Sequence, residues 1–216
     1  MRPFSLLHAT SLILSLNLAS PFRPLTTNGI RTRLPPAVQD VRHLRESSLL
    51  KNSIDDNDFG QDAVLENEEP LSVIFQRGVV LQRSGDHQGA LKEYKLFIKA
   101  AEGCGVSPDM FAEVHVNIGA VYFKDAENED LAKHHFELAI GYRPVGTAYV
   151  NLALIALRKG ASAGTTDPAA GRACLEEART NLEKAIELGD TEQSKMAAIK
   201  LLEDVKAITK QMNLMG

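Results

Sequence analysis

The chain has 216 residues, of which 44% are hydrophobic and 24% are charged, and its formal net charge is −4. This length allows one domain with extensions, and the mildly acidic balance lacks the basic patch that nucleic-acid binding requires. Composition therefore favours a soluble protein with a helical or mixed core and excludes a dedicated nucleic-acid binder.

Residues 1–39 are expected to be a targeting segment that is removed. They contain four of the 24 Lys and Arg residues and no carboxylate, which leaves 20 basic residues against 28 acidic ones, a net charge of −8, in the remainder. The apolar run from Leu6 to Ala19 is too short and too often interrupted by polar residues to span a bilayer. It is typical of a signal peptide, and the acid-free stretch rich in Ser, Thr, Pro and Arg that follows is typical of a transit peptide.

The junction between these two parts carries a short motif. Ala19, Ser20 and Phe22 stand there, with Pro21 between the last two. This arrangement resembles the bipartite plastid leader of diatoms and related algae, which implies import into a plastid. A plain secretory signal and a mitochondrial presequence are the alternatives, and in each case we expect the mature chain to have no integral membrane segment.

Residues 40–69 are rich in Asp, Glu, Asn and Ser and show little hydrophobic periodicity. Such a segment cannot bury enough apolar surface to order itself, so we expect an acidic disordered linker here. The helical-repeat domain is then expected over residues 70–212.

Helix boundaries are marked by Gly and Pro throughout that domain. Pro70 and the Ser-Pro-Asp run at 107–109 are typical helix starts, and Gly85 is expected to separate the helices of a first hairpin. Residues 101–106 form an extension, and Pro144 closes the second hairpin. In the third hairpin, Asp167 and Pro168 should cap a lengthened second helix, which leaves a flexible loop at 161–166.

Small and aromatic residues recur at equivalent places in these hairpins. Gly78 and Gly119 each interrupt an amphipathic pattern, which costs about 1 kcal/mol relative to Ala and indicates that a second backbone approaches closely. Ala153 stands 34 residues after Gly119, the tetratricopeptide period. The repeat-defining positions are Gly78, Ala90 and Tyr94, then Gly119, Tyr122, Ala132, Phe136, Ala139 and Pro144, then Ala153, Ala178 and Ala185.

On these residues the chain resembles a tetratricopeptide repeat (TPR) protein. The resemblance implies an all-α, right-handed solenoid of antiparallel helix hairpins, with about three repeats. A last amphipathic helix over residues 191–212 is expected to cap the open end.

No pattern of catalytic chemistry stands out. There is no P-loop, no metalloprotease motif and no Cys/His cluster, and the neighbouring His134 and His135 point about 100° apart on a helix. We therefore expect no enzyme activity, no cofactor and no metal; a metal-dependent enzyme using these two His residues is the least favoured alternative.

The TPR resemblance implies a partner-binding groove along the first helix of each hairpin. By register the groove residues are Phe75, Val79, Gln82 and Arg83; Val116, Asn117, Ala120, Phe123 and Lys124; and Val150, Asn151, Leu154, Leu157 and Arg158. This surface is apolar with three cations at its edge, which suits an amphipathic helix or an apolar peptide of another protein. We expect a non-catalytic interaction or assembly module. A homodimer that uses the same groove is the main alternative, and a third possibility is that the chain fills the groove itself.

Overall fold

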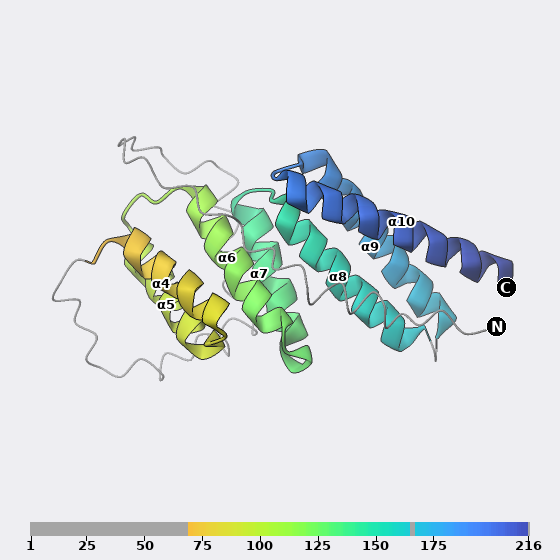
Figure 1. Ribbon diagram of the computed structural model, residues 1–216, viewed down its shortest axis with the longest axis horizontal. Helices are drawn as coiled ribbons and strands as arrows, with labels where there is room; N and C mark the ends of the chain where they lie inside the picture. The colour runs from red at the N-terminus through yellow and green to blue at the C-terminus, as the bar shows by residue number, and fades with distance from the viewer. Residues whose placement is uncertain (1–68, 165–166, 216) are drawn as a thin grey trace. The chain divides into compact units, whose positions relative to one another are not determined.

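The computed structural model describes residues 69–164 and 167–215, and these residues are all-α. They form seven helices packed as sequential antiparallel pairs (Figure 1). The described residues fall into two compact units, residues 69–143 and residues 144–215, which are taken one at a time below. The predicted leader and nearly all of the predicted acidic linker lie outside the described residues.

The first unit contains two hairpins. Helices α4 (Leu71–Ser84) and α5 (His87–Ala101) form the first, and α6 (Pro108–Phe123) and α7 (Glu129–Tyr142) form the second. A 3₁₀ turn, η2 (Ala126–Asn128), connects α6 with α7. Figure 1 shows each pair running side by side in opposite directions.

The predicted stop and start signals of the first hairpin are confirmed. Gly85 ends α4 with a φ of 90°, a left-handed conformation that favours glycine. The Asp86 side chain then caps α5 by accepting a hydrogen bond from the Gly89 N–H at 2.8 Å. The predicted extension after α5 is a turn in which Gly103 and Gly105 both have positive φ. Ser107 precedes α6 as expected, although its side chain makes no capping hydrogen bond.

The first hairpin has an aromatic core. Phe75, Tyr94 and Phe97 are each at most 1% exposed, and the Phe75 ring lies 6.0 Å from both of the other rings. The Tyr94 hydroxyl donates a 2.6 Å hydrogen bond to Gln82 Oε1, so the one polar atom of this aromatic core has a partner. Phe97 is therefore a packing residue of this hairpin.

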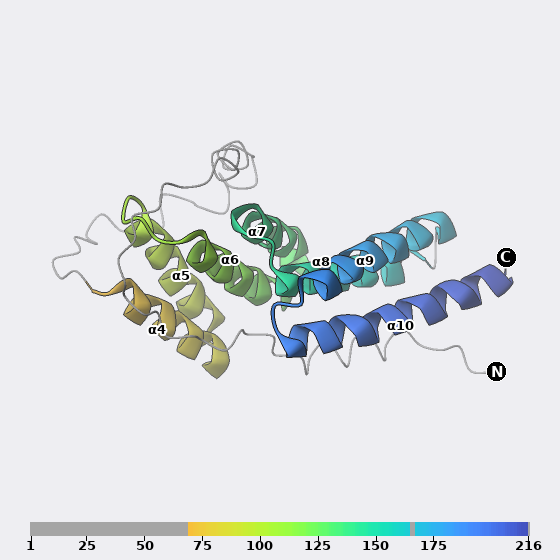
Figure 2. The same ribbon diagram turned by 90° about the horizontal axis from the view of Figure 1, so that it is seen from above.

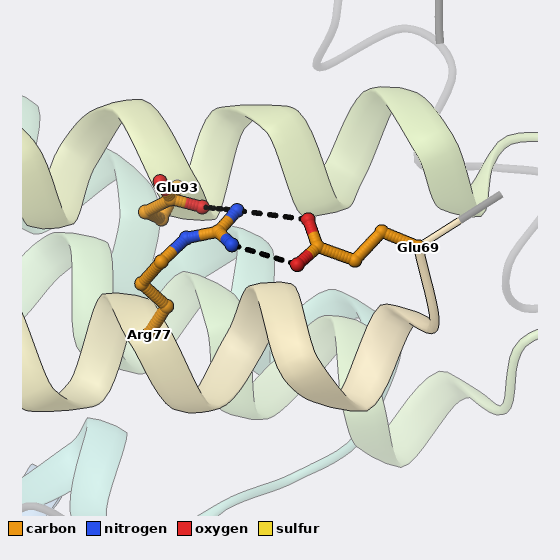
Figure 3. A network of polar contacts seen from close by, with 3 residues as sticks. All are labelled: Glu69, Arg77 and Glu93. Carbon is orange, nitrogen blue, oxygen red and sulfur yellow. Dashed lines mark hydrogen bonds and ion pairs between the residues drawn. The ribbon is translucent and has the colours of Figure 1, made fainter. Parts of the chain in front are cut away.

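The same hairpin is closed at its surface by a polar network (Figure 3). The Arg77 guanidinium donates to both carboxylate oxygens of Glu69, at 2.8 and 3.1 Å, and to Glu93 at 2.7 Å. Glu69 precedes α4 and Glu93 belongs to α5, so Arg77 connects the start of one helix to its neighbour. Together the two carboxylates raise the pKa of Arg77 further, with Glu93 the larger influence.

The two predicted glycine positions are close approaches, but what approaches is a ring and not a backbone. A Cβ atom added at Gly78 would lie 2.7 Å from Tyr94 Cε1, and one added at Gly119 would lie 2.7 Å from Phe136 Cε1. Tyr94 and Phe136 are both fully buried. In each hairpin of this unit, the first helix therefore leaves a glycine-sized gap that an aromatic ring of the second helix fills.

The second unit contains α8 (Gly146–Ala163), α9 (Pro168–Leu188) and α10 (Glu192–Met215). Helices α8 and α9 form an antiparallel pair, and α10 packs mainly on α9 and also on α8 (Figure 2). Asp167 caps α9 as predicted, since its carboxylate accepts from the N–H groups of Ala169 and Ala170. The Asp190 carboxylate accepts from the Gly146 N–H at the start of α8.

The insertion in the third hairpin extends both helices, and the first half of the expected flexible loop, residues 161–163, is helical. Helix α8 continues through Ala163, which is three residues into the predicted loop 161–166. Glycine permits this extension because a Cβ at Gly171 would lie 2.9 Å from the Gly164 Cα, and one at Gly160 would lie 2.9 Å from the Cys174 Cβ. The close approach of two backbones that we predicted at Gly119 occurs here instead.

Helix α10 buries the first four residues of the apolar face expected at Ala198, Leu201, Leu202, Val205, Ile208 and Met212, and the last two are half-buried. Ala198, Leu201, Leu202 and Val205 are each at most 9% exposed, whereas the acidic and basic side chains between them face outward. This amphipathic pattern is the reason that α10 packs along the α8–α9 pair. No described helix is long and apolar enough to span a membrane.

The repeat-defining positions lie in the interior with two exceptions. Tyr122 is half-buried and Pro144 is exposed. The remaining ten are buried: Gly78, Ala90, Tyr94, Gly119, Ala132, Phe136, Ala139, Ala153, Ala178 and Ala185.

Candidate functional site: the first helices and the histidine stack

The predicted groove is buried at most of its positions. Nine of the fourteen side chains are at most 8% exposed, so they belong to the interior and do not form an open surface. These nine are Phe75, Gln82, Val116, Asn117, Phe123, Val150, Asn151, Leu154 and Leu157.

The physical reasons differ between the helices. In α4, Phe75 packs against Tyr94 and Phe97, and Gln82 accepts the Tyr94 hydrogen bond, so both are core residues of the hairpin. Helix α6 contacts α4, α5 and α7, and α8 contacts α9 and α10, which leaves little of either helix free. Asn151 is satisfied within α8, where its Nδ2 donates to the Thr147 carbonyl at 3.0 Å. The expectation that Phe123 and Leu157 are accessible anchors is wrong.

Five of the predicted groove residues keep some accessibility. Val79, Ala120 and Arg158 are half-buried, and Arg83 and Lys124 are exposed. Within the first unit these residues make two equivalent pairs, Val79 with Arg83 on α4, and Ala120 on α6 with Lys124, the residue that caps the C-terminal end of α6 in a helical conformation. Each pair is spaced by four residues, so the apolar and the cationic side chain share one helix face. Two of the three predicted cations are therefore exposed and the third, Arg158, is half-buried, and their role at the edge of a binding surface stays a prediction.

The neighbouring polar groups around Lys124 are already engaged. The Asp125 carboxylate accepts from the Glu127 N–H at 3.1 Å and from Asn128 Nδ2 at 2.8 Å. His87 Nε2 lies 3.4 Å from Lys124 Nζ. Burial first, and the Lys124 charge second, lower the pKa of His87, so His87 is neutral at neutral pH. Arg83 and Lys124 therefore provide the positive charge at this end of α4 and α6.

A second cluster, which sequence reasoning missed, lies between α6 and α7. His115 Nδ1 and His135 Nδ1 are 3.0 Å apart, and the two rings are stacked with an interplanar angle of 25°. Tyr142 stacks on His115 at 5.5 Å, and Tyr122 stacks on His135 at 5.6 Å. Phe111 continues the series by stacking on Tyr142 at 5.1 Å. We call these five rings the histidine stack.

The sequence does contain a signal for this stack. Phe111, His115 and Tyr122 are spaced by four and seven residues, and His135 and Tyr142 by seven, so each set lies on one helix face. The adjacent His134 and His135 point in different directions, so they are not each other's stacking partners. The real partner of His135 is His115, from the other helix of the hairpin.

The environment of the stack disfavours positive charge. His115 and His135 are 6% and 7% exposed, and His135 Nε2 has no hydrogen-bond partner among the described residues. Burial lowers the pKa of His135 well below 6.5, and the charges of His115, His134 and Lys95 act in the same direction. Burial also lowers the pKa of His134, whose Nε2 is likewise buried without a hydrogen-bond partner in the described part of the chain.

The histidine stack does not form a metal centre by itself. Among residues 69–164 and 167–215, no three His, Cys, Asp or Glu side chains come together in a way that could hold a metal ion. The two cysteines are free thiols, and Cys104 is exposed rather than buried as its residue type suggested.

A hollow of about 390 Å³ lies between α9 and α10 in the second unit. Arg179, Lys206 and Lys210 line it together with Glu176, which forms an ion pair with Arg179. All four of these side chains are exposed, so the hollow is a surface depression with mixed charge.

Comparisons with known proteins give no relative for this chain. No family model, no curated protein and no solved structure matches it. The fold and the residues described above are therefore the basis for a functional assignment.

Proposed function

We propose that this chain is a non-catalytic protein-binding module of the TPR kind, imported into a plastid, whose hairpins form a right-handed solenoid capped by α10. The partner is a protein segment that combines acidic and apolar side chains. It binds the first unit at the surface formed by Val79, Arg83, Ala120 and Lys124, which we call the α4–α6 surface.

The observation that carries this proposal is the repetition of one apolar and one cationic residue at equivalent positions of α4 and α6. Arg83 follows Gly78 by five residues, and Lys124 follows Gly119 by five residues. Both cations are exposed on helices whose other sides are packed. Repeat proteins use matching positions of successive repeats to read successive residues of an extended ligand. Here that ligand would present two carboxylates to two cations.

The burial of the other groove residues changes the expected character of binding. With Phe123 in the interior, the apolar contribution is limited to the half-buried Val79 and Ala120. The two cations at this surface are exposed, and attraction between exposed charges is screened by salt. We therefore expect binding that weakens as salt is raised, in contrast to the salt-insensitive binding that an apolar groove would give.

A displayed library of random peptides of about twelve residues tests the proposal with the full chain as target. Selected peptides should combine acidic and apolar residues. They should bind the double variant Arg83→Glu, Lys124→Glu at least about tenfold more weakly, because each repelled charge contributes about 1 kcal/mol or more at such a contact.

Lys92→Glu is the matched control, since Lys92 is an exposed lysine on α5, away from the α4–α6 surface, and undergoes the same charge reversal. Circular dichroism should show that all variants keep their helices. If no acidic peptide is enriched, or if the selected peptides bind the double variant as tightly as the wild type, the proposed binding surface is wrong.

Self-association is a second candidate, favoured by one specific observation. Val73 and Val80 are 40% and 64% exposed, and their spacing of seven residues places them on one face of α4. Light scattering across a dilution series of the full chain should then show a dimer that Val80→Lys converts to a monomer. A monomer at every concentration would remove this candidate and leave the peptide-binding proposal intact.

A further inference from the structure

The His115–His135 contact constrains where protons can lie. Each neutral imidazole carries one N–H and one lone pair, so a 3.0 Å contact between two Nδ1 atoms is favourable only if one of them donates and the other accepts. Two Nδ1–H groups at that distance would place two donors against each other, and protonation of both nitrogens in both rings would add two positive charges. The contact is therefore compatible with at most one Nδ1 proton.

The stack also fixes the two rings in place. His115 is stacked between Tyr142 and His135, and His135 is stacked between His115 and Tyr122. A half-turn of either ring about its Cβ–Cγ bond would keep the stacking but would replace Nδ1 by Cδ2, so the hydrogen bond between α6 and α7 would be lost. A doubly protonated contact is consequently relieved either by that loss or by local separation of α6 and α7, and both weaken the connection between the two helices.

We propose that the His115–His135 pair is a proton-sensitive latch between α6 and α7. The latch holds the two helices together while the pair shares one Nδ1 proton, and it loosens when acid protonates both rings. This inference does not depend on the proposed partner binding.

The surrounding charges make acid the effective signal. His115 from α6, His134 from α7 and Lys95 from α5 all act on His135, and none of them is a carboxylate that could compensate a second proton. Glu113, the half-buried carboxylate of α6, is influenced by Arg143 and Asp109. The groups that lower the pKa of His135 are thus all basic side chains.

The sign of the pH dependence follows from the lowered pKa of His135. The opened hairpin, with ordinary histidines, binds more protons than the closed hairpin at pH values between the lowered pKa and 6.5. The stabilising contribution is therefore fully present above pH 6.5 and is lost as the pH falls below that value. Within this window the opening equilibrium constant should rise up to about tenfold per pH unit for each histidine that protonates.

Amide hydrogen exchange on the full chain measures this opening directly. After correction for intrinsic exchange rates, protection of α6 and α7 amides should fall at least about tenfold between about pH 7.5 and about pH 5.5. The double variant His115→Phe, His135→Phe keeps two stacked rings that cannot protonate, so most of the acid response in α6 and α7 should be lost. The part that remains belongs to His134, whose pKa burial also lowers.

His87→Gln is the control variant, because His87 is outside the stack and is not paired with another histidine. It should keep the full acid response of α6 and α7. A wild type whose α6 and α7 protection is unchanged between the two pH values would refute the latch. A double variant that keeps the full acid response of the wild type would also refute it.

A measurement on the wild type covers the case in which the double variant fails to fold. The chain has six histidines, and proton NMR reports the titration of each imidazole. The ring signal of His135, assigned by its contact with Tyr122, should remain that of a neutral imidazole well below pH 6.5, because its pKa is lowered. If His135 titrates near 6.5 while α6 and α7 stay protected, the pair is not a latch.

Discussion

The two units solve the same packing problem with opposite choices of residue size. In the first unit, Gly78 and Gly119 each face the ring of an aromatic residue on the paired helix, Tyr94 and Phe136. In the second unit, register places Ala153 where the glycine would be and Leu182 where the ring would be, and both are fully buried. The volume removed from one helix is thus supplied by the other. Either combination fills the interface between two antiparallel helices.

The second unit uses its glycines for a different purpose. Gly160, Gly164 and Gly171 lie where α8 and α9 come closest, and there an added Cβ would meet backbone or Cβ atoms of the other helix or its own. A ring in a side chain can move by a few tenths of an ångström, whereas a backbone inside a helix cannot without moving the helix. Glycine is therefore a matter of side-chain fit in the first unit and of helix separation in the second.

Removal of a ring should have the largest effect. Phe136→Ala leaves a cavity opposite Gly119, where no side chain can expand to fill it, and should lower the free energy of unfolding by about 3–5 kcal/mol. Leu182→Ala, at the equivalent position of the second unit, removes a smaller side chain and should cost less. Denaturant unfolding measures both, and equal costs would mean that the ring-on-glycine contact adds nothing.

A side chain added where the backbones of α8 and α9 touch should cause the next largest loss of stability. Gly171→Leu forces α8 and α9 apart, because even its Cβ would lie 2.9 Å from the Gly164 Cα, and should cost at least about 1–3 kcal/mol. Ala173→Leu adds a comparable side chain at an exposed position of the same helix and is the control. A thermal melt in which both variants match the wild type would show that the helices do not approach closely at Gly171.

Replacement of the glycine–aromatic pair of the first unit by the alanine–leucine pair of the second should change the free energy of unfolding by less, because the two substitutions partly compensate each other. Gly119→Ala improves helix propensity by about 1 kcal/mol but drives a Cβ into the fully buried Phe136 ring, so we expect a net loss of about 1 kcal/mol. Phe136→Leu alone leaves unfilled space.

The double variant Gly119→Ala, Phe136→Leu recreates the Ala153–Leu182 combination. It should be more stable than the sum of its single changes predicts, with a coupling of about 0.5–3 kcal/mol. If the two single changes simply add in a double-mutant cycle, Gly119 and Phe136 do not interact energetically.

The sequence predicted the local features of this fold well because their causes are local. Gly85, Asp86 and Asp167 act on their own backbone, and all three form the helix boundaries that were expected. Residue identity fixes such features through allowed φ values and nearby N–H groups. The extension of α8 through Ala163 was not predicted, because it depends on how closely α9 can approach.

The candidate site was harder to predict because burial is a property of the whole packing arrangement. Val116 and Leu154 occupy positions that are apolar in an open groove and equally apolar in a core, and periodicity alone cannot distinguish the two. The His115–His135 contact joins residues twenty positions apart on different helices. Arg83 and Lys124 are exposed, as their charge alone suggests, since charged residues are almost never buried without a partner. Their role at the edge of a binding surface stays a prediction.

The smallest effect is expected at the surface network of the first hairpin (Figure 3). Arg77 donates to Glu69 and Glu93, but its side chain is 40% exposed, and exposed ion pairs contribute about 0–1 kcal/mol because water and salt screen them. Arg77→Met keeps the side-chain length and removes the charge, so it should lower stability by less than about 1 kcal/mol. High salt should erase the difference from the wild type, because screening weakens the ion pairs that only the wild type has. Arg77→Lys, which keeps the charge and loses the two-oxygen contact with Glu69, should fall between the two. A loss several times larger, unaffected by salt, would place Arg77 among the packing residues with Tyr94 rather than at the surface.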